Sequence, residues 1–151
     1  MDNQKEKNSY NQELIIRANI KDSFSALTQK IDLWWGEVDQ PIAKVGDEFS
    51  VSFANANWSF RVTEFVPNSK LTWECIGGNP EFNTEWIGDL LYWNMEEVEG
   101  DKVKISLLQV GLTPEMNCFE ICNKGWNFFI TKSLKSYLET GVGNLNFVEP
   151  E

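Results

Sequence analysis

The side chains that could carry acid–base or nucleophilic chemistry in this sequence are carboxylates, lysines, tyrosines and cysteines, because its 151 residues include no histidine. This excludes Ser-His-Asp and Cys-His catalysis, as well as zinc and haem sites that depend on histidine ligands. The remaining residues form no readable nucleophile–base pair. We therefore predict no catalytic residue, no metal site and no cofactor, and we favour a binding protein over an enzyme.

Asp89 is the carboxylate with the most informative position. In a strand predicted over residues 85–98 it shares the alternation of Trp93, so it would point into an apolar interior, where a carboxylate needs a partner or a proton. Gln109 has the inward parity of the next strand. The two side chains could then orient a mainly apolar ligand. Alternatively Gly88 marks a bulge that turns Asp89 to solvent, which is the interpretation we favour.

The three cysteines, Cys75, Cys118 and Cys122, form no closed disulfide framework because their number is odd. Cys118 and Cys122 are four residues apart, which places them on one face of a helix. A redox or metal role is one interpretation of this pair. We favour the other, two small apolar residues on a buried stripe, because free cysteine is usually buried and no further soft ligand is nearby.

The elements that must position these residues follow from the apolar periodicity. A strand is predicted over 13–20, followed by two short helices, the first capped by Asp22 or Ser23. Alternation with period two then predicts an antiparallel series of strands with one apolar face. Thr113-Pro114-Glu115 has the composition of a helix start, and apolar residues at helical spacing continue to Gly141, a natural stop.

Length and charge limit the class of protein. The chain suits a single domain over residues 12–143, with an N-terminal tail 1–11 and a C-terminal tail 144–151. Its 13 basic and 23 acidic residues give a net charge of −10, which opposes binding to nucleic acid and to anionic membranes. The polar start carries no signal-peptide core and no window could span a membrane, so we expect an acidic cytoplasmic protein.

Four local motifs, in this order, resemble the activator-of-Hsp90-ATPase-like family. The first is an "ALT…WWG" pattern, the next two are strand openings, and the last is a closing helix. They occupy residues 24–28 with 33–36, residues 46–49, residues 71–74, and residues 125–129 with 133–141. The similarity covers about residues 13–143. It implies an α+β helix-grip fold of the START-like (Bet v 1-like, SRPBCC) superfamily, in which a curved antiparallel sheet wraps a long C-terminal helix and leaves an apolar cavity.

The resemblance and the strand parity together predict which side chains line that cavity or fill the core behind it. Trp34 and Trp35 could guard its mouth or pack inside it. The predicted cavity set is Trp34, Trp35, Phe49, Val51, Phe53, Trp58, Phe60, Val62, Trp73, Cys75, Asp89, Leu91, Trp93, Gln109, Cys122, Trp126 and Phe129. Aromatic residues make up 13% of the chain, and large rings can also close such a cavity by filling it.

Three functions remain open at this point. The first is binding of a small hydrophobic molecule, such as a lipid or another ligand of the superfamily. The second is a chaperone-associated interaction through the acidic surface, which the family name implies, although the family's co-chaperone activity depends on an additional domain for which this chain has no room. The third is an enzyme that uses Asp89 as acid or base. We expect a monomer or a weak homodimer, since an open sheet has free edges.

Overall fold

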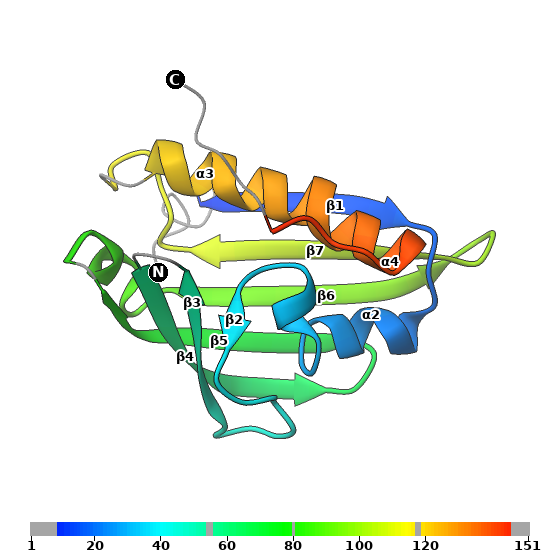
Figure 1. Ribbon diagram of the computed structural model, residues 1–151, viewed down its shortest axis with the longest axis horizontal. Coiled ribbons are helices and arrows are strands. Elements are labelled where there is room, and N and C mark those ends of the chain that lie inside the picture. The colour runs from blue at the N-terminus through cyan, green and yellow to red at the C-terminus, as the bar shows by residue number, and fades with distance from the viewer. Residues whose placement is uncertain (1–8, 54–55, 80, 117–118, 146–151) are drawn as a thin grey trace.

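The fold is a single curved antiparallel sheet held against one long C-terminal helix (Figure 1). The computed structural model describes residues 9–53, 56–79, 81–116 and 119–145. Its seven strands follow the order β1-β7-β6-β5-β4-β3-β2. The strands are β1 (Tyr10–Ile16), β2 (Glu37–Val38), β3 (Glu48–Phe53), β4 (Ala56–Val66), β5 (Lys70–Asn79), β6 (Leu90–Val98) and β7 (Lys102–Val110). The helical elements are α2 (Ile20–Ala26), η1 (Ile31–Leu33), η2 (Glu81–Trp86), α3 (Phe119–Phe128), η3 (Phe129–Leu134) and α4 (Lys135–Thr140).

Burial alternates along the strands, so each strand directs every second side chain towards the concave side of the sheet. In β7 every second residue is buried, from Val103 to Gln109, while its partners on β1 and β6 continue the same inward face. Trp73 of β5 pairs with Leu91 of β6, so large apolar side chains from adjacent strands meet on the concave side. A sheet with one apolar face needs a cover, and the helix supplies it. The predicted helix-grip architecture is confirmed.

The long helix has three consecutive parts. Residues 119–140 run through α3, the π-helical segment η3 and α4, and the helix ends at Gly141, which adopts a left-handed φ of 89°. The sequence prediction of a start at Thr113 is wrong. Thr113 instead accepts a hydrogen bond from the backbone N–H of Met116 in a turn, and the helix is described from Phe119 onward.

Two further boundaries differ from the sequence prediction. The first strand ends at Ile16, because Asn19, not Asp22 or Ser23, caps α2: its side chain accepts the N–H of Asp22 at 2.7 Å. The predicted strand 85–98 is also too long. Its first part forms the 3-10 turns of η2, and β6 begins only at Leu90, after a left-handed residue that breaks the alternation.

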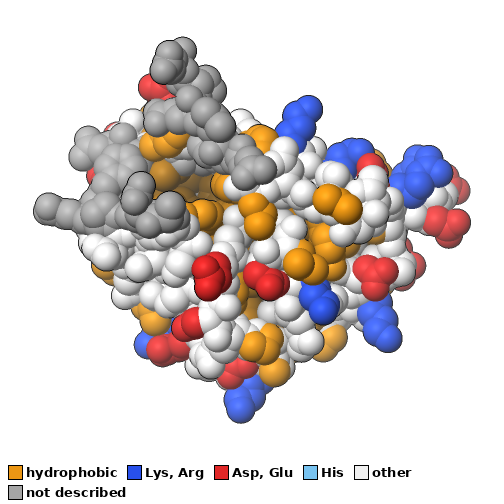
Figure 2. All heavy atoms as spheres, viewed as in Figure 1, with side chains coloured by type: hydrophobic (Ala, Val, Ile, Leu, Met, Phe, Trp, Pro, Cys, Tyr) orange, Lys and Arg blue, Asp and Glu red, His pale blue; other side chains and the backbone are white. Residues whose placement is uncertain are grey.

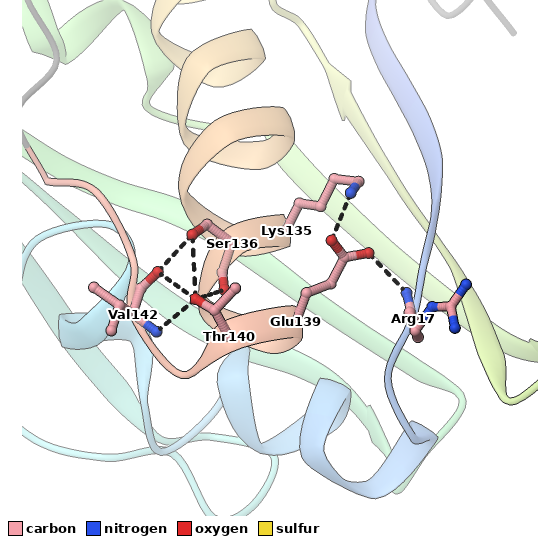
Figure 3. Close-up of polar contacts among 6 residues, drawn as sticks. All are labelled: Arg17, Lys135, Ser136, Glu139, Thr140 and Val142. Carbon is pink, nitrogen blue, oxygen red and sulfur yellow. Dashed lines mark hydrogen bonds and ion pairs between the residues drawn. The ribbon is translucent and has the colours of Figure 1, made fainter.

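One end of the long helix, which we call the packed end, is fastened by several contacts. It comprises α4, η3, α2 and η1 with the strand segments beneath them. Glu139 of α4 accepts a hydrogen bond from the backbone N–H of Arg17 at 3.0 Å and pairs with Lys135 at 2.6 Å (Figure 3). These two donors lower the pKa of the Glu139 carboxyl below its ordinary value, Lys135 contributing most.

The interior of the packed end is filled by aromatic and aliphatic side chains. The Trp34 indole donates to the carbonyl of Ala26 at 2.7 Å, and its ring meets Trp93 edge-on at a centroid distance of 6.0 Å. Ser133 of η3 donates to the carbonyl of Trp34 and accepts from the N–H of Asn144. The helix, η1 and the segment after the helix are therefore joined by one hydroxyl.

Among the described residues, no helix combines the length and the apolar character that crossing a membrane requires.

Candidate functional site

A pocket of about 600 Å³ lies at the other end of the long helix, which we call the pocket end. It is open to one side and is bordered by α3 and the start of η3, by β2, by the facing ends of β3 and β4, and by η2. Figure 2 shows hydrophobic side chains recessed on this side of the molecule near α3. The lining residues are Trp35, Gly36, Glu37, Ser52, Phe53, Ala56, Trp58, Trp86, Ile121, Cys122, Gly125, Trp126, Phe129 and Leu145. The lining is mainly apolar, as ligand pockets usually are.

Four tryptophans dominate the pocket wall, and we call them the indole cluster: Trp35, Trp58, Trp86 and Trp126. They form two stacked pairs, Trp58 on Trp86 with centroids 4.4 Å apart and Trp35 on Trp126 at 4.7 Å. The pairs lie side by side, with Trp86 5.9 Å from Trp126 and Trp35 6.4 Å from Trp58. Neighbouring rings deviate from parallel by only 17° to 29°.

The sequence neighbourhood of Trp58 explains how this stacking arises. Trp58 lies opposite Gly78 in the β4–β5 register. Because glycine has no side chain, the ring of Trp58 is free to lie flat against Trp86 from η2. Gly77 and Gly78 both lie within β5.

A buried relay of polar groups holds one indole of the cluster. The side-chain amide of Gln109 donates to Oδ2 of Asp89 at 2.9 Å, and the indole N–H of Trp126 donates to Oε1 of Gln109 at 2.9 Å. These residues are 6%, 0% and 2% exposed for Asp89, Gln109 and Trp126. Because Gln109 donates through its NH₂ group and accepts through its oxygen at the same time, its amide has one orientation, and the hydrogen bond to the indole N–H fixes the orientation of the Trp126 ring.

The favoured expectation that Asp89 points to solvent is therefore wrong. Gly88 does adopt a left-handed φ of 94°, but the result is that Asp89 remains inside and Ile87 is 51% exposed. Space for the carboxylate comes from Gly111, where a β-carbon would overlap Oδ1 of Asp89. Asp89 and Gln109 do not line the pocket: they lie behind Trp126, and their contact with a ligand would be indirect.

The structure divides the predicted cavity set into two groups. Those that reach the pocket wall are Trp35, Phe53, Trp58, Cys122, Trp126 and Phe129. Those that pack in the closed core or in the buried relay are Trp34, Phe49, Val51, Phe60, Val62, Trp73, Cys75, Asp89, Leu91, Trp93 and Gln109. Both alternatives raised from the sequence are therefore present in one molecule, a filled interior and an open pocket at one end of it.

The sequence analysis missed several lining residues, above all Trp86. The alternation of the predicted strand 85–98 directs odd-numbered residues such as Asp89 inward, so it does not indicate that Trp86 is buried; the turn of η2 leaves Trp86 2% exposed. Gly88 was the sequence feature that could have indicated the end of η2 and the later start of β6. Glu37 and Ser52, paired across β2 and β3, had no signal in the periodicity because both are exposed on the pocket rim.

Cys75 is a thiol held in its neutral form. Burial raises its pKa to about 12, and the charge of Asp89 adds to this, partly opposed by a hydrogen bond from the thiol to the carbonyl of Gly77. Nucleophilic or metal-binding cysteines need the thiolate. Cys122 lines the pocket, whereas Cys118 lies outside the described residues, so the predicted pair is not tested. Within the described ranges no three His, Cys, Asp or Glu residues gather as a metal site.

Four indole N–H groups are buried without a hydrogen-bond partner in the described part of the chain, those of Trp58, Trp73, Trp86 and Trp93. Trp73 and Trp93 belong to the closed core, where ring edges and faces surround them. Trp58 and Trp86 are members of the indole cluster, so the pocket wall holds two unsatisfied donors. A buried donor without an acceptor is costly. Because both nitrogens are buried, the pocket borders the rings of Trp58 and Trp86 and not their N–H groups.

No protein-family model matches the chain, and no curated protein matches its sequence significantly. Solved structures do. The chain is similar to Aha1 from Colwellia psychrerythraea, solved in solution as a dimer, with 25% identity, a TM-score of 0.76, and coverage of 89% of this chain and 98% of that one. It is also similar to MLL2253 from Mesorhizobium loti, with 18% identity, a TM-score of 0.69, and coverage of 85% and 96%.

A third similar structure is DynU16, a protein of the dynemicin biosynthetic locus, with 17% identity and a TM-score of 0.70. The match covers 90% of this chain but 49% of DynU16, so this chain spans about half of that protein. The sheet order, the C-terminal helix and these neighbours confirm the fold that the sequence resemblance implied: the chain is a helix-grip domain with structural neighbours among Aha1 and SRPBCC-like proteins.

Proposed function

We propose that the protein binds a small, mainly apolar molecule in the pocket beneath α3. The observation that carries this proposal is the pocket itself, about 600 Å³ in volume and walled by the indole cluster. Pockets that hold small ligands commonly measure roughly 300–1,000 Å³ and combine an apolar lining with a few polar groups. Here the polar side chains are those of the rim residues Glu37 and Ser52.

The buried relay supports the same function. Gln109 and Asp89 hold Trp126 in one plane, and Trp126 is the residue that joins the two stacked pairs of the cluster on the helix side. A wall whose rings are fixed before binding loses little conformational entropy when a ligand arrives. The relay is therefore a support for the pocket, and its residues are positioning residues.

A panel of fatty acids, sterols and flavonoid-like aromatics tests this function by calorimetric titration. The blocking variant is Gly125→Leu, because Gly125 lines the pocket from α3 and a leucine there would occupy it. Leucine also favours a helix over glycine, so the fold should tolerate the change. We expect at least one class to bind, and the blocked variant to lose at least about tenfold in affinity.

Gly125→Ala is the matched control, since it improves the helix in the same way but adds only a methyl group. Its affinity should stay close to that of the parent protein. Binding that is equal in the parent, Gly125→Ala and Gly125→Leu proteins would place the ligand elsewhere and contradict the proposal.

A second candidate function is a protein interaction with an Hsp90-type chaperone, which the sequence resemblance to the activator-of-Hsp90-ATPase-like family implies. The net charge of −10 favours a basic surface on that partner. Titration with purified Hsp90 at two salt concentrations tests it. Complex formation that weakens with salt and survives in Gly125→Leu would support this function, and no complex at low salt would exclude it.

A further inference from the structure

We infer that the pocket selects a flat, conjugated ring system that is neutral or positively charged, in preference to an anion or a flexible chain. This inference rests on the proposed function and narrows it to a chemical class of ligand. Two independent features carry it: the common orientation of the indole rings, and the charges that the pocket presents.

The ring orientation favours a flat ligand. The four rings of the indole cluster form two stacked pairs whose neighbouring planes differ by at most 29°. Aromatic rings gain energy from offset stacking beyond the area that they bury. A planar ligand can extend this near-parallel array, whereas an alkyl chain gains only the burial of its surface. The pocket therefore distinguishes flat rings from chains of similar hydrophobicity.

The charges oppose an anionic ligand. Glu37 is the only charged side chain among the described residues that line the pocket, and neither lysine nor arginine is among them. A carboxylate placed here would lose its hydration without gaining a counter-charge, which is costly. It would also face Glu37 and a protein of net charge −10.

The same features attract a cationic ring. An indole face attracts cations through its quadrupole, and the attraction strengthens when the cation is desolvated. The Glu37 carboxylate lies at the rim on β2, where the positive or hydrogen-bond-donating end of a ligand could reach it. Because Glu37 is exposed, its share of the attraction should fall as salt is added.

Calorimetry at pH 7 with four probes tests this inference. The probes are a flat ring system and a flexible chain, each as a cation and as an anion. The flat cation is 9-aminoacridine and the flat anion is anthracene-9-carboxylate; the flexible cation is dodecylamine and the flexible anion is dodecanoate. We expect 9-aminoacridine to bind most tightly, and the flat anion and the flexible cation to bind at least about tenfold more weakly. Glu37→Gln should reduce the preference for 9-aminoacridine over anthracene-9-carboxylate without changing the fold.

Each probe is also titrated into Gly125→Leu, which separates the pocket from non-specific attraction to an acidic protein. If anthracene-9-carboxylate or dodecanoate binds as tightly as 9-aminoacridine and is lost in Gly125→Leu, the proposed function stands and the inference about the ligand class is wrong. If 9-aminoacridine binds equally to Gly125→Leu and to the parent protein, its binding lies outside the pocket and the inference is wrong. Failure of the wider panel to show any pocket-dependent ligand would overturn the proposed function itself.

Discussion

The two ends of the space beneath the C-terminal helix are built from the same kinds of side chain, yet one is filled and the other is hollow. At the packed end, α2 lies beside α4 on the same side of the sheet and contacts β6, β7 and α4 (Figure 1). The Trp34 ring of the following η1 then completes the filling. At the pocket end no second α-helix of the described part of the chain lies beside α3 (Figure 1).

The difference teaches that aromatic content does not decide whether a helix-grip domain has a pocket. Trp73 and Trp93 are at most 1% exposed, and the neighbouring side chains of the core surround them. Three members of the indole cluster are nearly as buried and Trp58 is half-buried, but all four border about 600 Å³ of free volume. The two ends differ in α2, because this helix and the η1 turn after it bring side chains into the space beside α4.

The largest effect should come from truncating one tryptophan at each end. Trp93→Ala removes a ring from the closed core and should lower the free energy of unfolding by about 3–5 kcal/mol, since the cavity can collapse only partly. Trp58→Ala, in which the parent ring is only half-buried, should cost less, about 1–2 kcal/mol. Urea titration of both variants measures these values.

Ligand affinity should change in the opposite order. Trp58→Ala should weaken a pocket ligand strongly, while folded Trp93→Ala should bind it nearly as well as the parent protein. Trp58→Phe is the conservative control, because it retains an aromatic ring in the cluster. Equal losses of affinity in Trp93→Ala and Trp58→Ala would remove the distinction between the two ends.

A smaller loss of stability is expected from substitution of Gly111, whose backbone lies against the Asp89 carboxylate of the buried relay. Gly111→Ala should destabilise the protein by about 2–4 kcal/mol, because φ is 119° and the new methyl group would overlap the Asp89 carboxylate. Gly88→Ala is the matched control: its φ is 94°, but nothing lies within 4 Å of the added carbon. It should cost only the left-handed backbone, about 1–2 kcal/mol.

Indole hydrogen exchange of Trp126 gives a second readout for this comparison. Displacing Asp89 should loosen Gln109 and expose the Trp126 N–H in Gly111→Ala, but not in Gly88→Ala. Equal stability of the two variants would mean that the contact between residues 111 and 89 does not matter.

The smallest predicted effect is a dependence of stability on alkaline pH. The pKa of Cys75 rises from 9.0 when unfolded to about 12 when folded, so the thiol keeps its proton in the folded state. Its contribution to stability is complete below pH 9 and is lost as the pH rises from 9 towards 12, because the unfolded chain ionises first. Between pH 9 and 10 this amounts to about 1 kcal/mol.

Cys75→Ala should remove this slope, whereas Cys122→Ala should keep it. Tyr10, whose pKa is also raised by burial, adds a loss that begins near its ordinary value of 10.0, so the window below that is the one to compare. Denaturant titrations at closely spaced pH values measure the slope. The same slope in both variants would show that Cys75 is not the responsible group.

The fold was predictable because alternation and helical spacing report which face of an element is buried. β3, β4, β5 and β7, the stop at Gly141 and the two short helices all followed from such patterns. Boundaries controlled by local hydrogen bonds did not, as the cap at Asn19 and the turn at Thr113 show. At such a boundary several neighbouring side chains could form the capping hydrogen bond, and apolar periodicity does not indicate which of them forms it.

The candidate site was less predictable for a physical reason. Trp58 and Trp73 have the same inward parity, but only the first borders the pocket, since the position of α2 decides which end is filled. Trp86 was missed because η2 interrupts the alternation just before the strand. Asp89 was expected to point outward, and it is buried because Gly111 leaves room for its carboxylate.

The most direct test of this account uses the indole N–H resonances of the seven tryptophans, one from each ring, in a ¹H–¹⁵N correlation spectrum. Titration with 9-aminoacridine should shift the signals of the indole cluster saturably. The signals of Trp34, Trp73 and Trp93, which lie in the closed core, should move much less. Shifts of equal size at all seven indoles, or largest at these three, would contradict a binding site confined to the pocket end.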